Sequence, residues 1–154
     1  MPLNQALVGK AYPAVSYEVG REKLREFAVA VGETDPVYHD EATARAAGHP
    51  DLPAVPTFAV VLSLRAGQVV YGDPELGLDY SRVVHGEQEF VYHRPIRAGD
   101  RLLAAGKVAS AAAKGPHELL TLETEITTEA AEPVCTVRAT LLSRGTAPPR
   151  GSGA

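Results

Sequence analysis

The segment from Thr57 to Tyr71 is apolar on nearly every side of the helix that its sequence predicts, and this restricts the fold more than any other feature of the chain. A helix without a polar face has to be buried by other elements. We expect Thr57 to cap its N-terminus and Gly72 to end it. The fold must therefore supply an apolar surface that wraps the residues Phe58, Val60, Val61, Leu62, Leu64, Ala66, Val69 and Val70.

The second half of the chain supplies that surface as strands. Leu120, Leu122 and Ile126 alternate with polar residues, which is the pattern of a strand with one buried face. Similar runs are predicted at about 84–92, 101–110 and 133–143, and Gly-, Pro- and charge-rich turns separate them. Such a series favours an antiparallel sheet. We therefore predict an α+β fold in which an antiparallel sheet wraps around a long apolar central helix.

The first third of the chain predicts two shorter helices. From Arg21 to Val31 the apolar residues recur at helical spacing, and Gly32 ends the pattern. A second helix is predicted from about Asp40 to Ala47, with Gly48 at its C-terminal end. No repeat or composition break divides the chain, so we expect one domain over residues 1–144. Residues 145–154 are rich in Gly, Pro and Ser, and we expect a disordered tail there.

Composition excludes several classes of function. The net charge is -4 and Lys and Arg are scattered, so nucleic acid is not expected as a partner. Cys135 is the single cysteine, which excludes an intrachain disulfide and fits a reducing compartment. No apolar run is long enough for a membrane span, no signal peptide is recognisable, and no ligand cluster indicates a metal. We expect a cytoplasmic protein without a metal or cofactor.

Acid and base side chains gather where the first helix ends, in the stretch Gly32-Glu33-Thr34-Asp35-Pro36-Val37-Tyr38-His39-Asp40. A carboxylate beside an imidazole is a common arrangement for proton transfer. A structural role is the competing interpretation. Asp35 before Pro36 is typical of a turn, and Tyr38 can donate a hydrogen bond or pack at a subunit boundary.

In the order and spacing of its short motifs, the chain from Leu3 to Ser143 resembles the MaoC-like hotdog family of (R)-specific enoyl hydratases and 3-hydroxyacyl thioester dehydratases. That family carries a Gly-Asp-x-Asn-Pro-hydrophobic-His motif, and the stretch beginning at Gly32 lies in the same register. Residues 84–90 and 94–100 are similar to the central strand and the Pro-hydrophobic-x-x-Gly-Asp turn of the family. The resemblance implies a single hotdog domain.

The resemblance also implies where catalysis would occur. In the family the motif's Asp and His transfer the protons, and the corresponding residues here are Glu33 and Tyr38. Glu is one methylene longer than Asp, and a phenol has an ordinary pKa of about 10, which makes it a poor base near neutrality. The chain is most similar to the short non-catalytic subunits of mycobacterial and actinobacterial (3R)-hydroxyacyl-carrier-protein dehydratases. This implies a chain that is inactive alone and active with a catalytic MaoC-like partner.

The substrate implied is an acyl-CoA or acyl-carrier-protein thioester. At the start of the apolar helix, the N–H groups of Thr57 and Phe58 would polarise the carbonyl of the thioester, although Pro56 has no N–H to donate. Pro56, Thr57, Phe58 and Val61 are therefore the expected substrate-binding residues.

Two other functions stay open. A self-sufficient hydratase would use His39, one position after the expected histidine, with Glu33 or Asp35. A hotdog thioesterase is a weaker version, because no carboxylate occurs from Ala54 to Gly72. A homodimeric module that binds acyl thioesters without chemistry is the third possibility.

Overall fold

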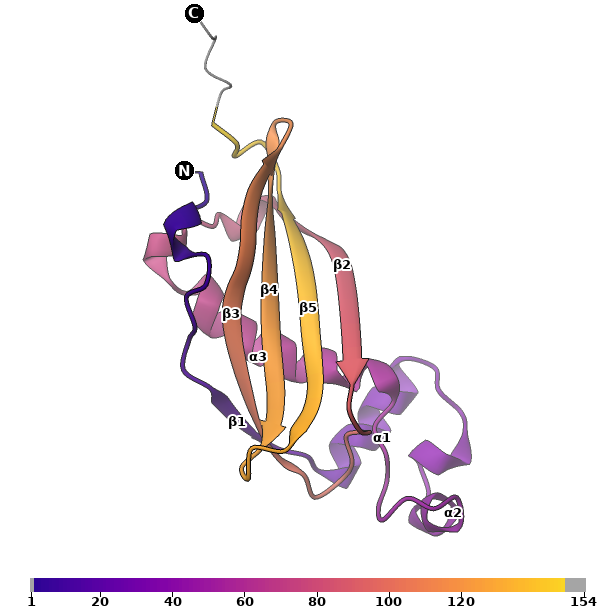
Figure 1. The fold of residues 1–154 in the computed structure, drawn as a ribbon. Coiled ribbons are helices and arrows are strands. Elements are labelled where there is room, and N and C mark those ends of the chain that lie inside the picture. The colour runs from indigo at the N-terminus through magenta and orange to yellow at the C-terminus, as the bar shows by residue number, and fades with distance from the viewer. Residues whose placement is uncertain (1, 149–154) are drawn as a thin grey trace, which may run out of the picture.

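A five-stranded antiparallel sheet curves around one helix, α3 (Figure 1). The computed structural model describes residues 2–148. The strand order is β1-β3-β4-β5-β2, so β1 and β2 form the two edges. The strands are β1 (Val15–Glu18), β2 (Val83–Tyr92), β3 (Arg101–Lys114), β4 (His117–Thr128) and β5 (Pro133–Ser143), and the helix α3 is Ala59–Tyr71. The predicted α+β architecture is confirmed.

The strands of the second half follow the predicted alternation. From Leu102 to Val108 on β3 and from Glu118 to Ile126 on β4 every second residue is buried. The hairpin is longer than predicted, because pairing continues to Lys114 opposite His117 across a tight turn. Gly115 has a φ of +61° in that turn, a conformation that glycine adopts readily. The strand β1 was not predicted from the sequence, because its four residues are too few to show a period.

The sheet covers one face of α3. Leu62, Ala66 and Val70 are fully buried on that face, but Leu64 is 51% exposed and Val69 is 37% exposed on the other. The expectation of a helix wrapped on all sides is therefore wrong for the isolated chain. Close approach of the sheet depends on a glycine: a Cβ at Gly106 of β3 would lie 3.2 Å from a methyl group of Val70.

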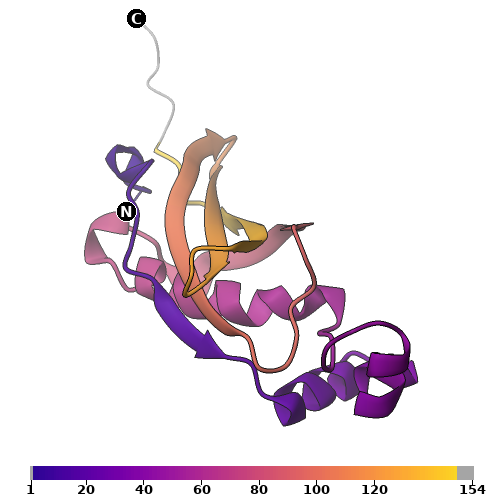
Figure 2. The ribbon, with the colours of Figure 1, turned by 60° about the horizontal axis from the view of Figure 1, so that its bottom comes forward.

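The first third forms a helical lobe, residues 21–51, at the end of the molecule where α3 begins (Figures 1 and 2). It consists of α1 (Arg21–Ala30), the 3-10 turn η2 (Pro36–Tyr38) and α2 (Glu41–Ala46). Both predicted helices are confirmed within a residue or two at each end. Gly32 and Gly48 follow them with φ values of +75° and +92°, as expected for glycines after helix ends.

Further 3-10 turns and the C-terminal residues complete the chain. The turns are η1 (Gln5–Leu7), η3 (Pro56–Phe58), η4 (Pro74–Leu76) and η5 (Tyr80–Arg82). The sequence predicts a tail over residues 145–154, of which 149–154 lie outside the described residues. Nearer the sheet, the Gly145 N–H donates to His117 Nδ1 at 3.1 Å, and the Ala147 N–H donates to the Pro116 carbonyl at 3.3 Å. Within residues 2–148 no helix has the length and hydropathy of a membrane span.

Candidate functional site

Local hydrogen bonds define the shape of the loop from Glu33 to Asp40. The Glu33 carboxylate accepts from the Asp35 N–H at 2.9 Å, and the Asp35 carboxylate accepts from the Val37 N–H at 3.0 Å. Asp35 thereby caps η2, as the turn interpretation predicted. At the other end, Asp40 caps α2 through Thr43, and these hydrogen bonds lower the pKa of the Asp40 carboxyl. Carboxylates of this loop therefore hold backbone groups in place.

His39 is held inside the same loop. Its Nε2 lies 2.7 Å from the Glu33 carbonyl oxygen, and its own carbonyl accepts from Arg25 Nε at 2.8 Å. A carbonyl only accepts hydrogen bonds, so Nε2 carries the proton and Nδ1 is the free acceptor in the neutral ring. The contact with Glu33 thus involves the backbone and not the carboxylate.

Tyr38 is half-buried beside both acidic residues. Burial raises the pKa of its phenol first, and the negative charges of Glu33 and Asp35 raise it further. Each effect favours the neutral phenol. At neutral pH the residue in the expected imidazole position therefore keeps its proton.

The start of α3 differs from the sequence expectation. Thr57 lies inside η3, and the residue that precedes α3 is Phe58, which has helical φ and ψ angles and no side-chain cap. A capping residue needs an extended backbone, so Thr57, already inside a helical turn, cannot act as the cap. The predicted capping role of Thr57 is wrong. The Phe58 N–H donates to the Val55 carbonyl at 2.8 Å.

The side chains of the expected substrate-binding residues lie in different environments. Pro56 and Thr57 are exposed and Val61 is half-buried against the core. Phe58 is fully buried, with its ring edge-to-face with Phe27 at a centroid distance of 5.3 Å. Of these four residues, Pro56 lines a pocket.

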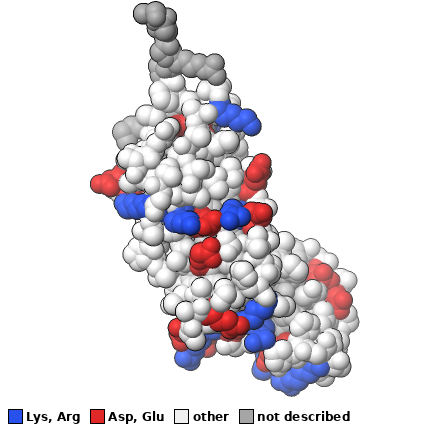
Figure 3. All heavy atoms as spheres, in the orientation of Figure 1, with Lys and Arg blue, Asp and Glu red and all other residues white. Residues whose placement is uncertain are grey.

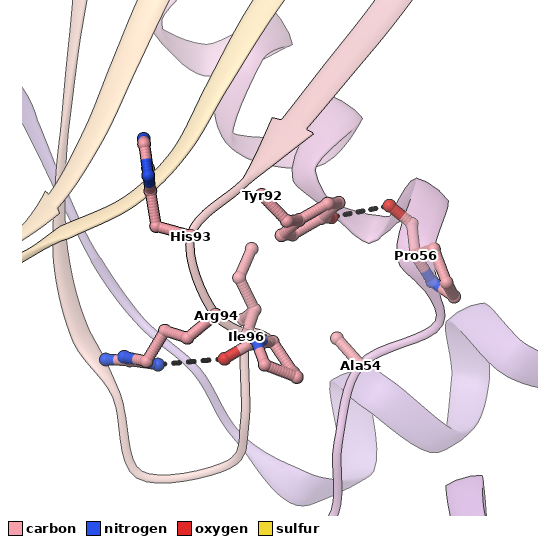
Figure 4. A pocket seen from close by; sticks show the side chains of 7 residues that line it. Ala54, Pro56, Tyr92, His93, Arg94 and Ile96 are labelled. Carbon is pink, nitrogen blue, oxygen red and sulfur yellow. Dashed lines mark hydrogen bonds between the residues drawn. The ribbon is translucent and has the colours of Figure 1, made fainter.

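That pocket has a volume of about 390 Å3 and lies beside the start of α3 (Figure 4). The end of β2 and the loop after it form one wall, and the loop before α3 forms the other. Tyr92 spans the two walls, because its hydroxyl donates to the Pro56 carbonyl at 2.5 Å. Burial raises the pKa of Tyr92, so it stays a neutral donor. The lining residues are Ala54, Pro56, Tyr92, His93, Arg94, Pro95 and Ile96.

An ion pair supports the wall that follows β2. Arg94 makes two hydrogen bonds to the Asp100 carboxylate, at 2.9 and 3.0 Å, and a third to Glu132 at 3.1 Å. The Ala54 N–H donates to the Ile96 carbonyl at 2.7 Å, which ties this wall to the loop before α3. Both sides of the pocket are therefore fixed to the sheet.

Tyr92 is a residue of the site that was not predicted from the sequence. The signal was present: Gln88, Phe90 and Tyr92 alternate along β2, and an aromatic residue at the end of that series faces the helix. The partner of its hydroxyl lies 36 residues away, and no local pattern indicates that contact. Cys135, opposite Tyr92 on β5, is buried, and burial raises the pKa of its thiol to about 11. Among residues 2–148 no cluster of potential metal ligands occurs.

Comparison with known proteins identifies the family. Residues 6–137 match the family described as FAS1-like, dehydratase domain region. The chain belongs to this family. A UPF0336 protein of Saccharopolyspora erythraea is 54% identical over 148 residues, covering 96% of this chain and 95% of that one. A UPF0336 protein of Streptomyces coelicolor is 48% identical over 145 residues, covering 94% and 97%.

Solved structures agree with the family assignment. The crystal structure of the C-terminally truncated HadBC (3R-hydroxyacyl-ACP dehydratase) complex of Mycobacterium tuberculosis matches with a TM-score of 0.76 at 30% identity, covering 86% of this chain and 92% of that one. A MaoC-like dehydratase matches with a TM-score of 0.84 at 30% identity, covering 91% of this chain but 43% of the longer one. The resemblance to MaoC-like hotdog proteins is confirmed, and the chain has a dehydratase-like hotdog fold.

Proposed function

We propose that this protein is a non-catalytic subunit of a heteromeric (3R)-3-hydroxyacyl-thioester dehydratase or (R)-enoyl hydratase. In this role it binds part of an acyl-CoA or acyl-carrier-protein thioester, while a MaoC-like hotdog partner supplies the Asp and His. HadBC and ChsH1-ChsH2 of M. tuberculosis are described as complexes, which supports a partner subunit.

The observation that carries the proposal is Tyr38. Elimination of water needs a group that accepts a proton near neutrality. The phenol in the motif position has a pKa raised above its ordinary value of about 10. A residue that keeps its proton at working pH cannot replace an imidazole as the base.

The rest of the loop supports the same conclusion. The Glu33 and Asp35 carboxylates bind backbone N–H groups, and His39 Nε2 contacts a backbone carbonyl. These groups stabilise the loop they belong to. A self-sufficient hydratase would have to use the free Nδ1 of His39, and the Glu33 or Asp35 carboxylate that works with it would need to exchange its backbone contact for one with substrate.

The start of α3 supports binding without chemistry. An oxyanion hole needs free N–H donors aimed at the substrate oxygen. Pro56 has no N–H, and the Phe58 N–H already donates to Val55, so of the two expected donors at most the Thr57 N–H is left for a substrate oxygen. The adjacent pocket of about 390 Å3 is within the usual range for small-molecule sites and can hold part of an acyl thioester.

Hydration of crotonyl-CoA tests the proposal. The purified chain should give a rate close to the uncatalysed one, and adding a hotdog chain with an intact Asp-x4-His motif should raise the rate by orders of magnitude over either chain alone. A reading frame beside the gene that encodes such a motif is the first partner to test.

His39→Ala is the matched control. It should leave the rate of the assembled complex within about twofold, because no reacting group is removed. Robust turnover by the chain alone that disappears in His39→Ala would contradict the proposal and establish the self-sufficient hydratase. Tight binding of a thioester without turnover in any mixture would establish the binding module.

A further inference from the structure

A groove lies between α3 and the start of β2, apart from the pocket at Pro56, which is called the first pocket below. The volume of the groove is about 360 Å3, within the usual range for small-molecule sites. Its walls are α3, β2 and the turn η5, and β5 contributes two buried residues. The lining residues are Val60, Ser63, Leu64, Tyr71, Tyr80, Val83, His85, Gln88, Ala139 and Leu141. None of them lines the first pocket, so the groove is a second cavity.

The groove is more polar at the end nearer the first pocket than at its far end. β2 runs from the groove to the first pocket, with Val83 first and the polar residues His85 and Gln88 after it. The side chains of His85 and Gln88 contact each other at 3.0 Å. At the far end, beside Val83, lie the rings of Tyr71 and Tyr80, whose centroids are 5.5 Å apart. A ligand that fits this lining is polar at one end and apolar at the other.

Ser63 on the helical wall carries a hydroxyl without a protein partner. The residue is 8% exposed and lines the groove, and its hydroxyl makes no hydrogen bond within residues 2–148. The oxygen is reachable from the groove, because no fully enclosed side-chain oxygen or nitrogen of the described residues is left unpaired. Buried polar groups are nearly always hydrogen-bonded in native proteins. An oxygen atom of a bound ligand would supply the missing partner.

The groove lining contains no Lys, Arg, Asp or Glu. Charged side chains lie instead on the outer surface, for example in the row of Lys107, Glu123 and Arg138 across the sheet (Figure 3). Phosphate groups are typically held by charge-assisted hydrogen bonds from Arg or Lys. The nucleotide part of a CoA thioester therefore does not match this lining, whereas an acyl chain, which is uncharged and mostly apolar, does.

The Tyr71 ring closes the far end of the groove and lies back along α3 over Gly67. Long side chains of a helix point towards its N-terminus and cover the residue four positions earlier. A Cβ at Gly67 would lie 2.9 Å from Cε2 of the Tyr71 ring, well inside the separation at which carbon atoms pack. A glycine within a helix destabilises it relative to alanine, so Gly67 has a packing reason to be there. Burial raises the pKa of Tyr71 to about 12, which keeps the ring uncharged.

We infer that the groove binds the acyl chain of the thioester and that Tyr71, packed on Gly67, limits the length of that chain. The oxygen-bearing end of the chain contacts Ser63, and its alkyl end meets the Tyr71 ring. Between these two residues α3 rises by about 12 Å, which leaves room for an alkyl segment beyond the oxygen. The inference depends on the proposed function, because an acyl thioester is taken as the ligand, and it adds the residues that select among such thioesters.

Binding of saturated acyl-CoA esters to the purified chain tests the length limit. Isothermal titration calorimetry with butanoyl-, hexanoyl-, octanoyl-, decanoyl- and dodecanoyl-CoA gives the dissociation constants. The affinity should rise about fourfold for each methylene group that is buried, and should stop rising once the chain meets Tyr71. Gly67→Ala lifts the Tyr71 ring off the helix towards the groove and should move the limit to a shorter chain. Tyr71→Ala should move it to a longer one.

Three variants separate the length limit from other effects. Tyr71→Phe keeps the ring and should keep the limit. Val69→Ala changes a partly exposed residue of α3 that does not line the groove, and should alter neither the affinity nor the limit. Ser63→Ala removes one hydrogen bond to the ligand and should weaken the binding of every ester about fivefold without moving the limit.

The same length limit in the native chain, Gly67→Ala and Tyr71→Ala would overturn the inference, and so would the absence of binding for every ester. Stronger binding by Ser63→Ala would also contradict it, because alkyl carbons would then lie at Ser63. None of these outcomes uses the hydration assay. Turnover by the chain alone would contradict the proposed function but would leave the length limit standing, so the two failures are distinguishable.

Discussion

The motif loop and the start of α3 lie at the same end of the molecule but are stabilised in different ways. In the loop from Glu33 to Asp40, carboxylates bind N–H groups two or three residues away. At the start of α3, by contrast, the Pro56 carbonyl accepts from Tyr92 and the Ala54 N–H donates to Ile96, so the bonds join distant segments. The loop keeps its shape mostly through bonds within its own sequence, with one contact from Arg25 of α1, whereas the pocket beside α3 exists only when the sheet has formed.

The largest effect is expected from Phe58, which packs the start of α3 against the helical lobe and β1. Its fully buried ring contacts Phe27 of the lobe and Tyr17 of β1. Phe58→Ala should lower the free energy of unfolding by about 3 to 5 kcal/mol, because it leaves a cavity at this junction. Urea unfolding measures the change.

Leu64→Ala is the matched control on the same helix. Leu64 is 51% exposed, so its truncation should cost well under 1 kcal/mol in the isolated chain. If Phe58→Ala and Leu64→Ala lower the unfolding free energy by similar amounts, the start of α3 is not packed more tightly than the rest of the helix. The proposed dependence of this region on long-range packing would then be wrong.

Tyr92→Phe removes the side-chain hydrogen bond across the pocket while keeping the ring. We expect a loss of about 1 kcal/mol in unfolding free energy, the usual contribution of one such bond. Tyr80→Phe is the control, because the Tyr80 ring is 62% exposed, and it should be nearly neutral. Hydrogen exchange of the backbone amides from Ala54 to Ala59 should become faster in Tyr92→Phe only. Unchanged exchange there would show that the pocket wall does not depend on this contact.

This contrast also explains what the sequence could and could not predict. The two helices of the lobe, four of the five strands and the turn role of Asp35 depend on periodicity and on contacts over a few residues, and these predictions agree with the structure. The pocket depends on Tyr92, whose partner lies 36 residues away. The cap at Thr57 was mispredicted because Pro56 starts a 3-10 turn before the helix, which sequence spacing alone does not distinguish from a helix start.

The smallest effect concerns an ion pair within the helical lobe. Arg21 makes two hydrogen bonds to Asp51, at 3.0 and 2.8 Å, and lies 2.5 Å from Glu41. These contacts, chiefly the hydrogen bonds from Arg21, lower the pKa of the Asp51 carboxyl to about 2. Because the pair is open to solvent, Asp51→Asn should cost less than about 1 kcal/mol at neutral pH.

The pH dependence of that cost identifies its origin. The pKa of Asp51 is lower in the folded chain than the ordinary value of about 4, so its ionised form is stabilised by folding. The contribution is complete above about pH 4 and is lost as the pH falls towards 2. The difference in unfolding free energy between the native chain and Asp51→Asn should therefore shrink over that range, while Glu129→Gln, in an exposed turn, should differ little from the native chain at any pH. If the difference in unfolding free energy stays constant down to pH 2, Asp51 stabilises the lobe through packing and not through its charge. The lobe would then be stabilised in the same way as the start of α3.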